Sequence, residues 1–274
     1  MPTNNRELIN KMSYTQIGNP KWRRDDLISE LSNFLEIYNK RPKISDNNCG
    51  GMNSPHLFPT WFFCRQFNPK YIIESGVWKG LGTWFFEQAC PDAKIISIDV
   101  NLGRREFISP NVKYITTDFS LNNWDDLIPK KDRENTLLHF DDHQGIGRII
   151  QCKELGFKHI MYEDNYHDFR GSFKGKDSFV KSGEDVSPKC ALVINNNVGA
   201  YDWLNQNIEI YYEFPPIYSG VDSPRGFRWA KISREKYINI TPEPLLATHK
   251  NKFDLYYKER FAYTWICYIK LKNN

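Results

Sequence analysis

The sequence predicts an α/β fold built on a mostly parallel β-sheet, and three observations support this. From residue 70 onward, short apolar segments alternate with amphipathic stretches, as strands alternate with helices in such folds. The first five apolar segments are each followed or closed by an acidic residue. Aromatic residues make up 15% of the 274 residues, too many for a disordered chain.

The first 69 residues are predicted to form a helical cap with a loop on the substrate side. Apolar residues from Asp25 to Tyr38 recur at spacings of three and four, which is typical of one face of a helix. A loop rich in Asn, Gly and Pro follows, and a short aromatic helix is expected from Thr60 to Gln66.

The second region, residues 70–274, is predicted to hold the α/β domain. Its strands are expected at residues 71–73, 95–98, 112–115, 136–140 and 159–162. Its helices are expected at Gly82 to Ala89, Leu121 to Ile128 and Ile146 to Leu155. Residues 166–231 are irregular and too long for a plain connection, so we interpret them as an insertion near the active face. The segments 253–257 and 263–271 are predicted to form a C-terminal antiparallel hairpin.

Composition and charge argue against several classes of protein. The net charge of +4 comes from 37 basic and 33 acidic residues that are interspersed, which does not favour a nucleic-acid partner. No apolar run approaches the roughly 20 residues needed to cross a bilayer, and no secretion signal is visible at the N-terminus. The six cysteines are scattered singly, as expected for free thiols in the cytoplasm. A homo-oligomer is compatible with the sequence.

The turn after the first strand carries the first candidate site. Its sequence runs from Glu74 through Gly76, Trp78 and Gly80 to Gly82 and enters a helix. Glycines let the backbone approach a nucleotide-like ligand, and a helix N-terminus offers free N–H groups. The spacing G-x-x-x-G-x-G differs from the dinucleotide fingerprint. Glu74 suits a ligand with a positive charge, such as the amino group of S-adenosylmethionine (AdoMet), although a turn without a ligand is the plain alternative.

Two further acidic strand ends extend this predicted cofactor site. Asp99 ends the second strand and could hold both hydroxyls of a ribose. Asp118 ends the third strand, where it could meet an adenine amino group while Phe119 lies against the ring. Each aspartate could instead cap a helix.

The ends of the fourth and fifth strands predict a metal site. Asp141, Asp142 and His143 follow the fourth strand, and Glu163 and Asp164 follow the fifth. Carboxylates gathered in this way repel one another unless a cation lies among them, and oxygen ligands favour Mg²⁺. A metal could hold two neighbouring substrate hydroxyls and lower the pKa of one, and His143 could remove its proton. The alternative is that His143 only orients an acid. His139 and Asp141 also match part of an iron-oxygenase motif, but that site requires an all-β fold.

Together these residues resemble the class I AdoMet-dependent methyltransferases. Within that class the chain is similar to the metal-dependent sugar and small-molecule O-methyltransferases grouped with the cephalosporin hydroxylase family. The resemblance runs from about Tyr71 to Asp164. It implies a Rossmann-like sheet, an AdoMet site at Glu74, Gly76, Trp78, Gly80, Asp99, Asp118 and Phe119, and Mg²⁺ bound by Asp141, Glu163 and Asp164.

The resemblance has one departure at the catalytic position. The family usually spaces its strand-four acid and histidine as D-x-x-H, whereas here Asp141, Asp142 and His143 are consecutive. Which aspartate binds the metal therefore stays open, and Asp142 joins His143 as a candidate catalytic residue.

The leading hypothesis is an AdoMet-dependent O-methyltransferase acting on a hydroxyl of a sugar or glycan. Aromatic residues at 61–63, 211–212 and 218 could stack on sugar faces, or they could simply pack in the core. The alternatives are a nicotinamide-dependent oxidoreductase on a similar sheet and a non-catalytic scaffold with a methyltransferase-like fold. The glycine spacing and the aspartates at strand ends disfavour the oxidoreductase.

Overall fold

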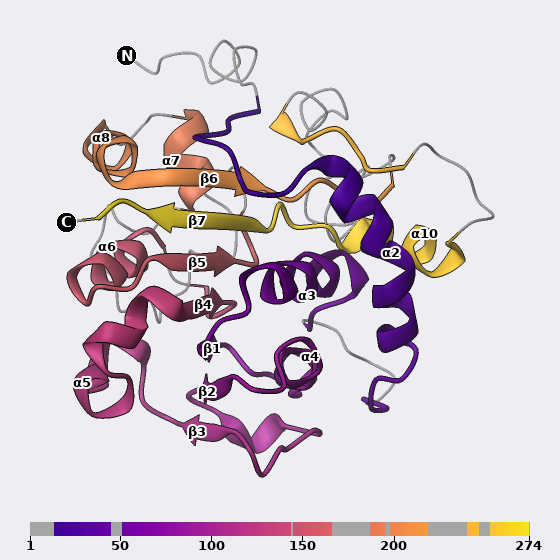
Figure 1. Ribbon diagram of the computed structural model, residues 1–274, viewed down its shortest axis with the longest axis horizontal. Helices are drawn as coiled ribbons and strands as arrows, with labels where there is room; N and C mark the ends of the chain where they lie inside the picture. Colours follow the sequence, from indigo (N-terminus) through magenta and orange to yellow (C-terminus); the bar gives the residue numbers. More distant parts are fainter. Residues whose placement is uncertain are drawn as a thin grey trace, which may run out of the picture.

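The computed structural model describes residues 14–44, 51–143, 145–165, 187–194, 198–218, 240–246 and 253–273. Its centre is a seven-stranded sheet with the strand order β3-β2-β1-β4-β5-β7-β6. The strands are β1 (Tyr71–Ser75), β2 (Lys94–Ile98), β3 (Lys113–Ile115), β4 (Thr136–Phe140), β5 (His159–Tyr162), β6 (Ile208–Glu213) and β7 (Cys267–Leu271). Figure 1 shows them stacked from β6 at the top to β3 at the bottom.

The sheet is parallel from β3 to β5, and β7 runs antiparallel to both β5 and β6. The predicted α/β fold with a mostly parallel sheet is confirmed. The predicted C-terminal hairpin is only half right, because residues 254–259 form helix α10 (Asp254–Glu259) and the antiparallel partner of β7 is β6. Residues 208–213 are therefore part of the sheet and not of an insertion. Residues 166–186 and 219–231 of that predicted insertion lie outside the described residues.

Helices cover both faces of the sheet. One apolar cluster joins α2 (Arg24–Tyr38), α3 (Ser54–Phe67) and α4 (Leu81–Ala89) to one face. The second cluster joins α5 (Trp124–Leu127), α6 (Gly147–Glu154), α7 (Pro188–Ile194) and α8 (Val198–Asn207) to the other. None of the described helices is long and apolar enough to cross a bilayer.

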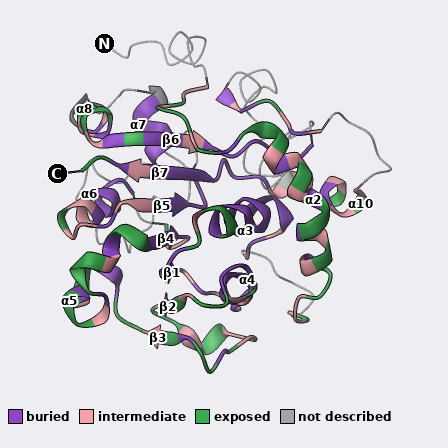
Figure 2. Ribbon diagram, viewed as in Figure 1, coloured by how far each residue is buried: buried purple, intermediate pink, exposed green. Residues whose placement is uncertain are grey.

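The N-terminal helices α2 and α3 belong to the apolar cluster that covers one face of the sheet. The expected helix at residues 25–38 is confirmed as α2, which buries Leu27, Leu31, Phe34 and Tyr38 along one face. Helix α3 starts earlier than expected, at Ser54, and every residue from Ser54 to Cys64 is buried. Figure 2 shows this contrast between a helix with one buried side and a helix buried over most of its length. Residues 61–63 and Tyr211 and Tyr218 are core residues, so they are not free to stack on a sugar in this structure.

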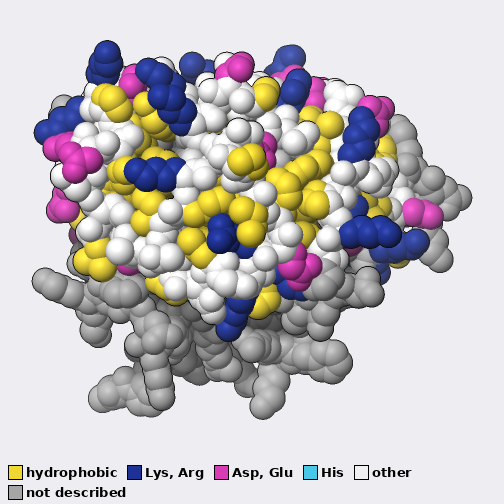
Figure 3. Space-filling model, turned by 90° about the horizontal axis from the view of Figure 1, so that it is seen from below, with side chains coloured by type: hydrophobic (Ala, Val, Ile, Leu, Met, Phe, Trp, Pro, Cys, Tyr) yellow, Lys and Arg dark blue, Asp and Glu magenta, His cyan; other side chains and the backbone are white. Residues whose placement is uncertain are grey.

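Charged and apolar side chains are mixed at the edge of the sheet formed by β3. Figure 3, seen from that edge, shows yellow apolar side chains among scattered basic and acidic groups. Among the described residues, the large apolar side chains that are exposed are Val100, Ile108 and Leu121. The expected helix from Leu121 to Ile128 is shorter, with a 3-10 turn at Phe119–Leu121 and α5 from Trp124.

Candidate active site

The carboxyl ends of β1, β4 and β5 meet at one edge of the sheet, as parallel strands require. Gly76 follows β1 with a φ of +98°, and a Cβ built on it would lie 2.5 Å from the carbonyl oxygen of Asp141. Gly80 has a φ of +89°, and its Cβ would lie 2.4 Å from the carbonyl oxygen of Phe107. These two glycines therefore let the turn pack against neighbouring backbone, and no bound ligand is needed to explain them.

Glu74 is the buried acid of this turn. Its Oε2 accepts hydrogen bonds from Thr83 Oγ1 at 2.5 Å and Ser97 Oγ at 2.6 Å. Its other oxygen, Oε1, is buried and has no hydrogen-bond partner among the described residues. Burial raises the pKa of Glu74 to about 7, although the two hydroxyl donors oppose that shift.

Asp99 holds the backbone of the glycine turn. Its Oδ2 accepts hydrogen bonds from the N–H groups of Val77 and Trp78 at 3.0 and 3.1 Å, and its Oδ1 accepts one from Asn101 N–H at 2.8 Å. Trp78 has a φ of +49°, and Arg104 lies over its ring. Its buried indole Nε1 has no hydrogen-bond partner in the part of the chain that the structure describes. The predicted contacts of Asp99 and Trp78 with a cofactor stay predictions.

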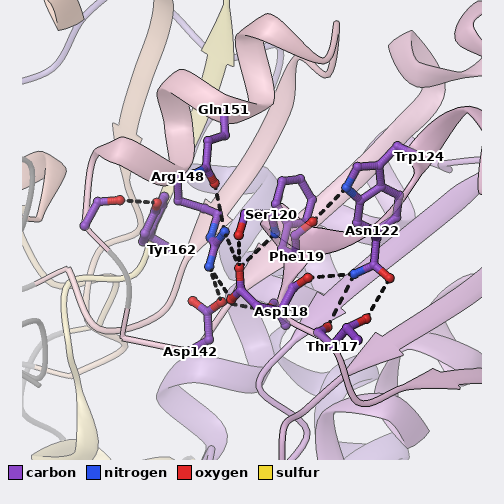
Figure 4. Close-up of polar contacts among 12 residues, drawn as sticks. Thr117, Asp118, Phe119, Ser120, Asn122, Trp124, Asp142, Arg148, Gln151 and Tyr162 are labelled. Atoms are coloured by element: carbon purple, nitrogen blue, oxygen red, sulfur yellow. Dashed lines mark hydrogen bonds and ion pairs between the residues drawn. The ribbon is translucent and has the colours of Figure 1, made fainter. Parts of the chain in front are cut away.

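The predicted adenine contacts differ from what the structure shows. Asp118 caps the turn at Phe119–Leu121 by accepting from the N–H and the hydroxyl of Ser120. It also forms a two-pronged ion pair with Arg148, at 2.7 and 3.1 Å (Figure 4). Phe119 is fully buried against Trp124 and Phe140, so its ring does not face a ligand site. The alternative of a capping role is the one that the structure supports for Asp118.

A cavity of about 10 Å³ lies at the glycine turn, lined by Gly51, Met52, Gly76, Trp78 and Asp141 among others. This volume is about the least that holds one water molecule. A larger cavity of about 390 Å³ is lined by residues of α5 and by Leu155 and Gly156. It lies near the amino end of β5, away from the acidic strand ends.

The acidic side chains that follow β4 and β5 lie in two different environments. Asp141, His143 and Asp164 each offer a ligand atom, and these atoms lie within 4.8 Å of one another. His143 is about half exposed, and its Nδ1 lies 3.5 Å from Asp164 Oδ2, while Asp164 is almost fully buried. One metal ion can reach donor atoms spaced in this way, and two carboxylates with an imidazole fit a divalent cation.

The side chains of Asp142 and Glu163 contact other residues, outside the cluster of Asp141, His143 and Asp164. Asp142 Oδ2 accepts a hydrogen bond from Ser75 Oγ at 2.6 Å and lies 3.5 Å from Arg148. Burial raises the pKa of Asp142, and the Arg148 guanidinium opposes that shift. Glu163 Oε1 lies 3.0 Å from Nδ1 of His56. The predicted metal ligands Asp141, Glu163 and Asp164 stay a prediction. Among the described residues, the donor atoms that lie together are those of Asp141, His143 and Asp164, and Asp142 is not grouped with them.

His56 is the site residue that the sequence did not predict. It lies in the first turn of α3, about a hundred residues before its partner Glu163, and both side chains are 2% exposed. Its Nε2 contacts the carbonyl oxygen of Ala262, so this nitrogen carries a proton. The only sequence signal was a histidine in a loop with turn residues, which does not indicate a site.

Comparisons with known proteins show similarity at the level of three-dimensional structure. No protein-family model matches the chain, and no curated protein matches it. A structure of the SAH-bound Podospora anserina methyltransferase PaMTH1 aligns over 78% of this chain and 93% of its own, at 15% identity and a TM-score of 0.43. The Streptomyces achromogenes O-methyltransferase TomG, in complex with SAM, aligns over 73% and 85%, at 11% identity and a TM-score of 0.39. A Mg–SAM structure of CmcI aligns over 60% and 78%, at 14% identity and a TM-score of 0.36.

At TM-scores below 0.5 these likenesses do not carry a functional assignment. The fold follows from the sheet itself, which is parallel from β3 to β5 with β7 antiparallel between β5 and β6. The protein has a Rossmann-like α/β fold, a mostly parallel sheet in which β7 is the antiparallel strand.

Proposed function

We propose that the protein is an AdoMet-dependent O-methyltransferase that uses a divalent metal, most simply Mg²⁺, and acts on a hydroxyl of a sugar or glycan. The observation that carries this proposal is the cluster of Asp141, His143 and Asp164 beside the glycine turn of β1. The backbone of Gly76 packs closely against the backbone of Asp141, and this close packing supports a cofactor turn beside a metal-ligand set.

The donor set fits a hard divalent cation. Asp141 and Asp164 would hold the metal through carboxylate oxygens. A metal bound there would lower the pKa of a substrate hydroxyl and orient it. His143, with Nδ1 turned toward Asp164, would act beside this metal as the base and not as a ligand, and it would accept the hydroxyl proton on Nε2. AdoMet bound at the turn would supply the methyl group, and S-adenosylhomocysteine would be the product that leaves.

The cofactor would lie along the turn after β1. Glu74, with one oxygen aimed away from its hydroxyl partners, suits the amino group of AdoMet. Asp99 would meet the ribose while keeping the turn in place through its bonds to Val77 and Trp78. Met52 and Gly82 line the cavity at this turn, so they would lie beside the bound cofactor.

Calorimetry tests the proposal directly. AdoMet and NAD are each titrated into the purified protein, once with Mg²⁺ and once with a chelator. We expect micromolar AdoMet binding and no heat with NAD. Binding of NAD alone would contradict the proposal and favour an oxidoreductase, and binding of neither would favour a scaffold. Methyl transfer to a panel of sugars with neighbouring hydroxyls, compared with their deoxy analogues, then tests the substrate class.

A further inference from the structure

Three consecutive residues after β4 face in two directions. The side chains of Asp141 and His143 gather with Asp164, and that of Asp142 meets Ser75 and Arg148. His143 has a φ of +60°, a left-handed conformation that a non-glycine residue keeps only when the surroundings hold it. The turn therefore needs an anchor.

Asp142 has the contacts of such an anchor. Its Oδ2 receives the Ser75 hydroxyl at 2.6 Å, from the last residue of β1. The same oxygen lies 3.5 Å from Nη2 of Arg148, which comes from α6. Asp142 is thereby tied both to the neighbouring strand and to the helix that follows it.

Arg148 extends the anchor to the next acidic strand end. Its side chain is fully buried, and Nη1 and Nη2 also donate to the two oxygens of Asp118 (Figure 4). Gln151, one turn further along α6, accepts a further hydrogen bond from Nη1 at 2.8 Å. A buried guanidinium with partners on two sides has a fixed position, so it can fix the carboxylates that it contacts.

We propose that Ser75 and Arg148 are positioning residues, which hold the Asp142 carboxylate so that Asp141 and His143 face Asp164. This inference rests on the proposed function, because it explains how that metal-ligand set is oriented. It assigns Asp141 as the ligand and Asp142 as the anchor. Groups that orient metal ligands typically change metal affinity by 10- to 100-fold when they are removed.

The test compares two buried serines on adjacent strands. Ser75→Ala removes the hydrogen bond to Asp142, and Ser97→Ala removes the equally short hydrogen bond to Glu74. Mg²⁺ is titrated by calorimetry into each full-length variant without AdoMet. We expect Ser75→Ala to weaken Mg²⁺ binding by at least tenfold, Ser97→Ala to stay within about twofold of the wild type, and Ser75→Thr to recover most of the affinity.

Each remaining outcome has a distinct meaning. Equal Mg²⁺ affinity in Ser75→Ala and the wild type overturns this inference and leaves the proposed function in place. No Mg²⁺ binding by the wild type overturns the metal part of the proposed function, and this inference with it. A second pair of variants checks the assignment: Asp141→Asn should abolish Mg²⁺ binding and Asp142→Asn should only weaken it. The reverse order contradicts the inference.

Discussion

His56 Nδ1 lies 3.0 Å from Glu163 Oε1, and this contact joins the N-terminal layer to the end of a central strand. The first turn of α3 is fixed at the same place by two more contacts, from Ser54 N–H to Glu259 and from His56 Nε2 to Ala262. The α3 helix, the segment before β7 and the end of β5 therefore meet at one buried pair.

This pair should make a large contribution to stability. His56→Ala leaves the buried Glu163 carboxyl group without its imidazole partner, and we expect a loss of about 1–3 kcal/mol in the free energy of unfolding. Urea unfolding of His56→Ala, Glu163→Gln and the double variant gives their coupling energy. His159, at the other end of β5, supplies the control, because His159→Ala and Glu163→Gln should be additive within about 0.5 kcal/mol. Additivity of the His56 variant as well would contradict the pairing.

Asp164 should be essential for Mg²⁺ binding but not for AdoMet binding. Asp164→Asn removes a charge from the cluster with Asp141 and His143, so we expect at least a tenfold loss of Mg²⁺ affinity. AdoMet affinity, measured with a chelator present, should change by no more than about twofold. Asp92→Asn, in an exposed turn, serves as the control. An unchanged Mg²⁺ affinity in Asp164→Asn would remove this residue from the site.

Glu74 should make the protein less stable as the pH rises. Its pKa of about 7 lies above the ordinary value of 4.5, so the folded state binds a proton that the unfolded state releases. Stability should therefore fall between about pH 4.5 and pH 7, by about 3 kcal/mol in total. Glu74→Gln should lack this slope in urea unfolding at pH 5, 6, 7 and 8, whereas Glu154→Gln, an exposed control, should keep it. A parallel slope in both variants would show that another group is responsible.

Gly76→Ala should destabilise the protein through a collision with the backbone of Asp141. Gly156 has a similar φ of +81°, but a Cβ there would meet nothing within 4 Å. The two alanine variants therefore share the cost of the left-handed conformation and differ in the collision. We expect Gly76→Ala to melt at a lower temperature than Gly156→Ala and to bind Mg²⁺ more weakly. Equal melting temperatures would mean that the turn can shift at no cost.

Much of the sheet could be predicted because its strands follow simple rules. Each of the first five apolar segments became a strand at nearly the expected residues, since a buried parallel strand needs little more than a short β-branched run between turns. The segment around Tyr256 and Tyr257 was misread as a strand. Aromatic residues favour strands on average, but here Tyr256 packs against Phe34 and Phe58 from a short helix.

The sequence indicated where in the fold the candidate site would lie, but not which side chains contact one another there. The acidic residues at strand ends were expected to meet because parallel strands bring their carboxyl ends together, and the structure does bring Asp141 and Asp164 together. Which carboxylate faces which partner depends on Arg148 and His56, and these come from helices whose positions the sequence pattern does not give. A buried arginine between two aspartates has no periodic signature.

β7 is the last strand in the chain but lies between β5 and β6 in the sheet, so the sheet can be completed only after β7 has been synthesised. β6 leaves the ribosome first, but its neighbour in the sheet is β7, which lies far later in the chain and separates β6 from β5. While the chain is growing, β5 presents an unpaired edge, which is a surface open to wrong strand partners. A pairing that spans so many residues also forms slowly. The edge of β5 therefore stays open to wrong strand partners until β7 has been synthesised.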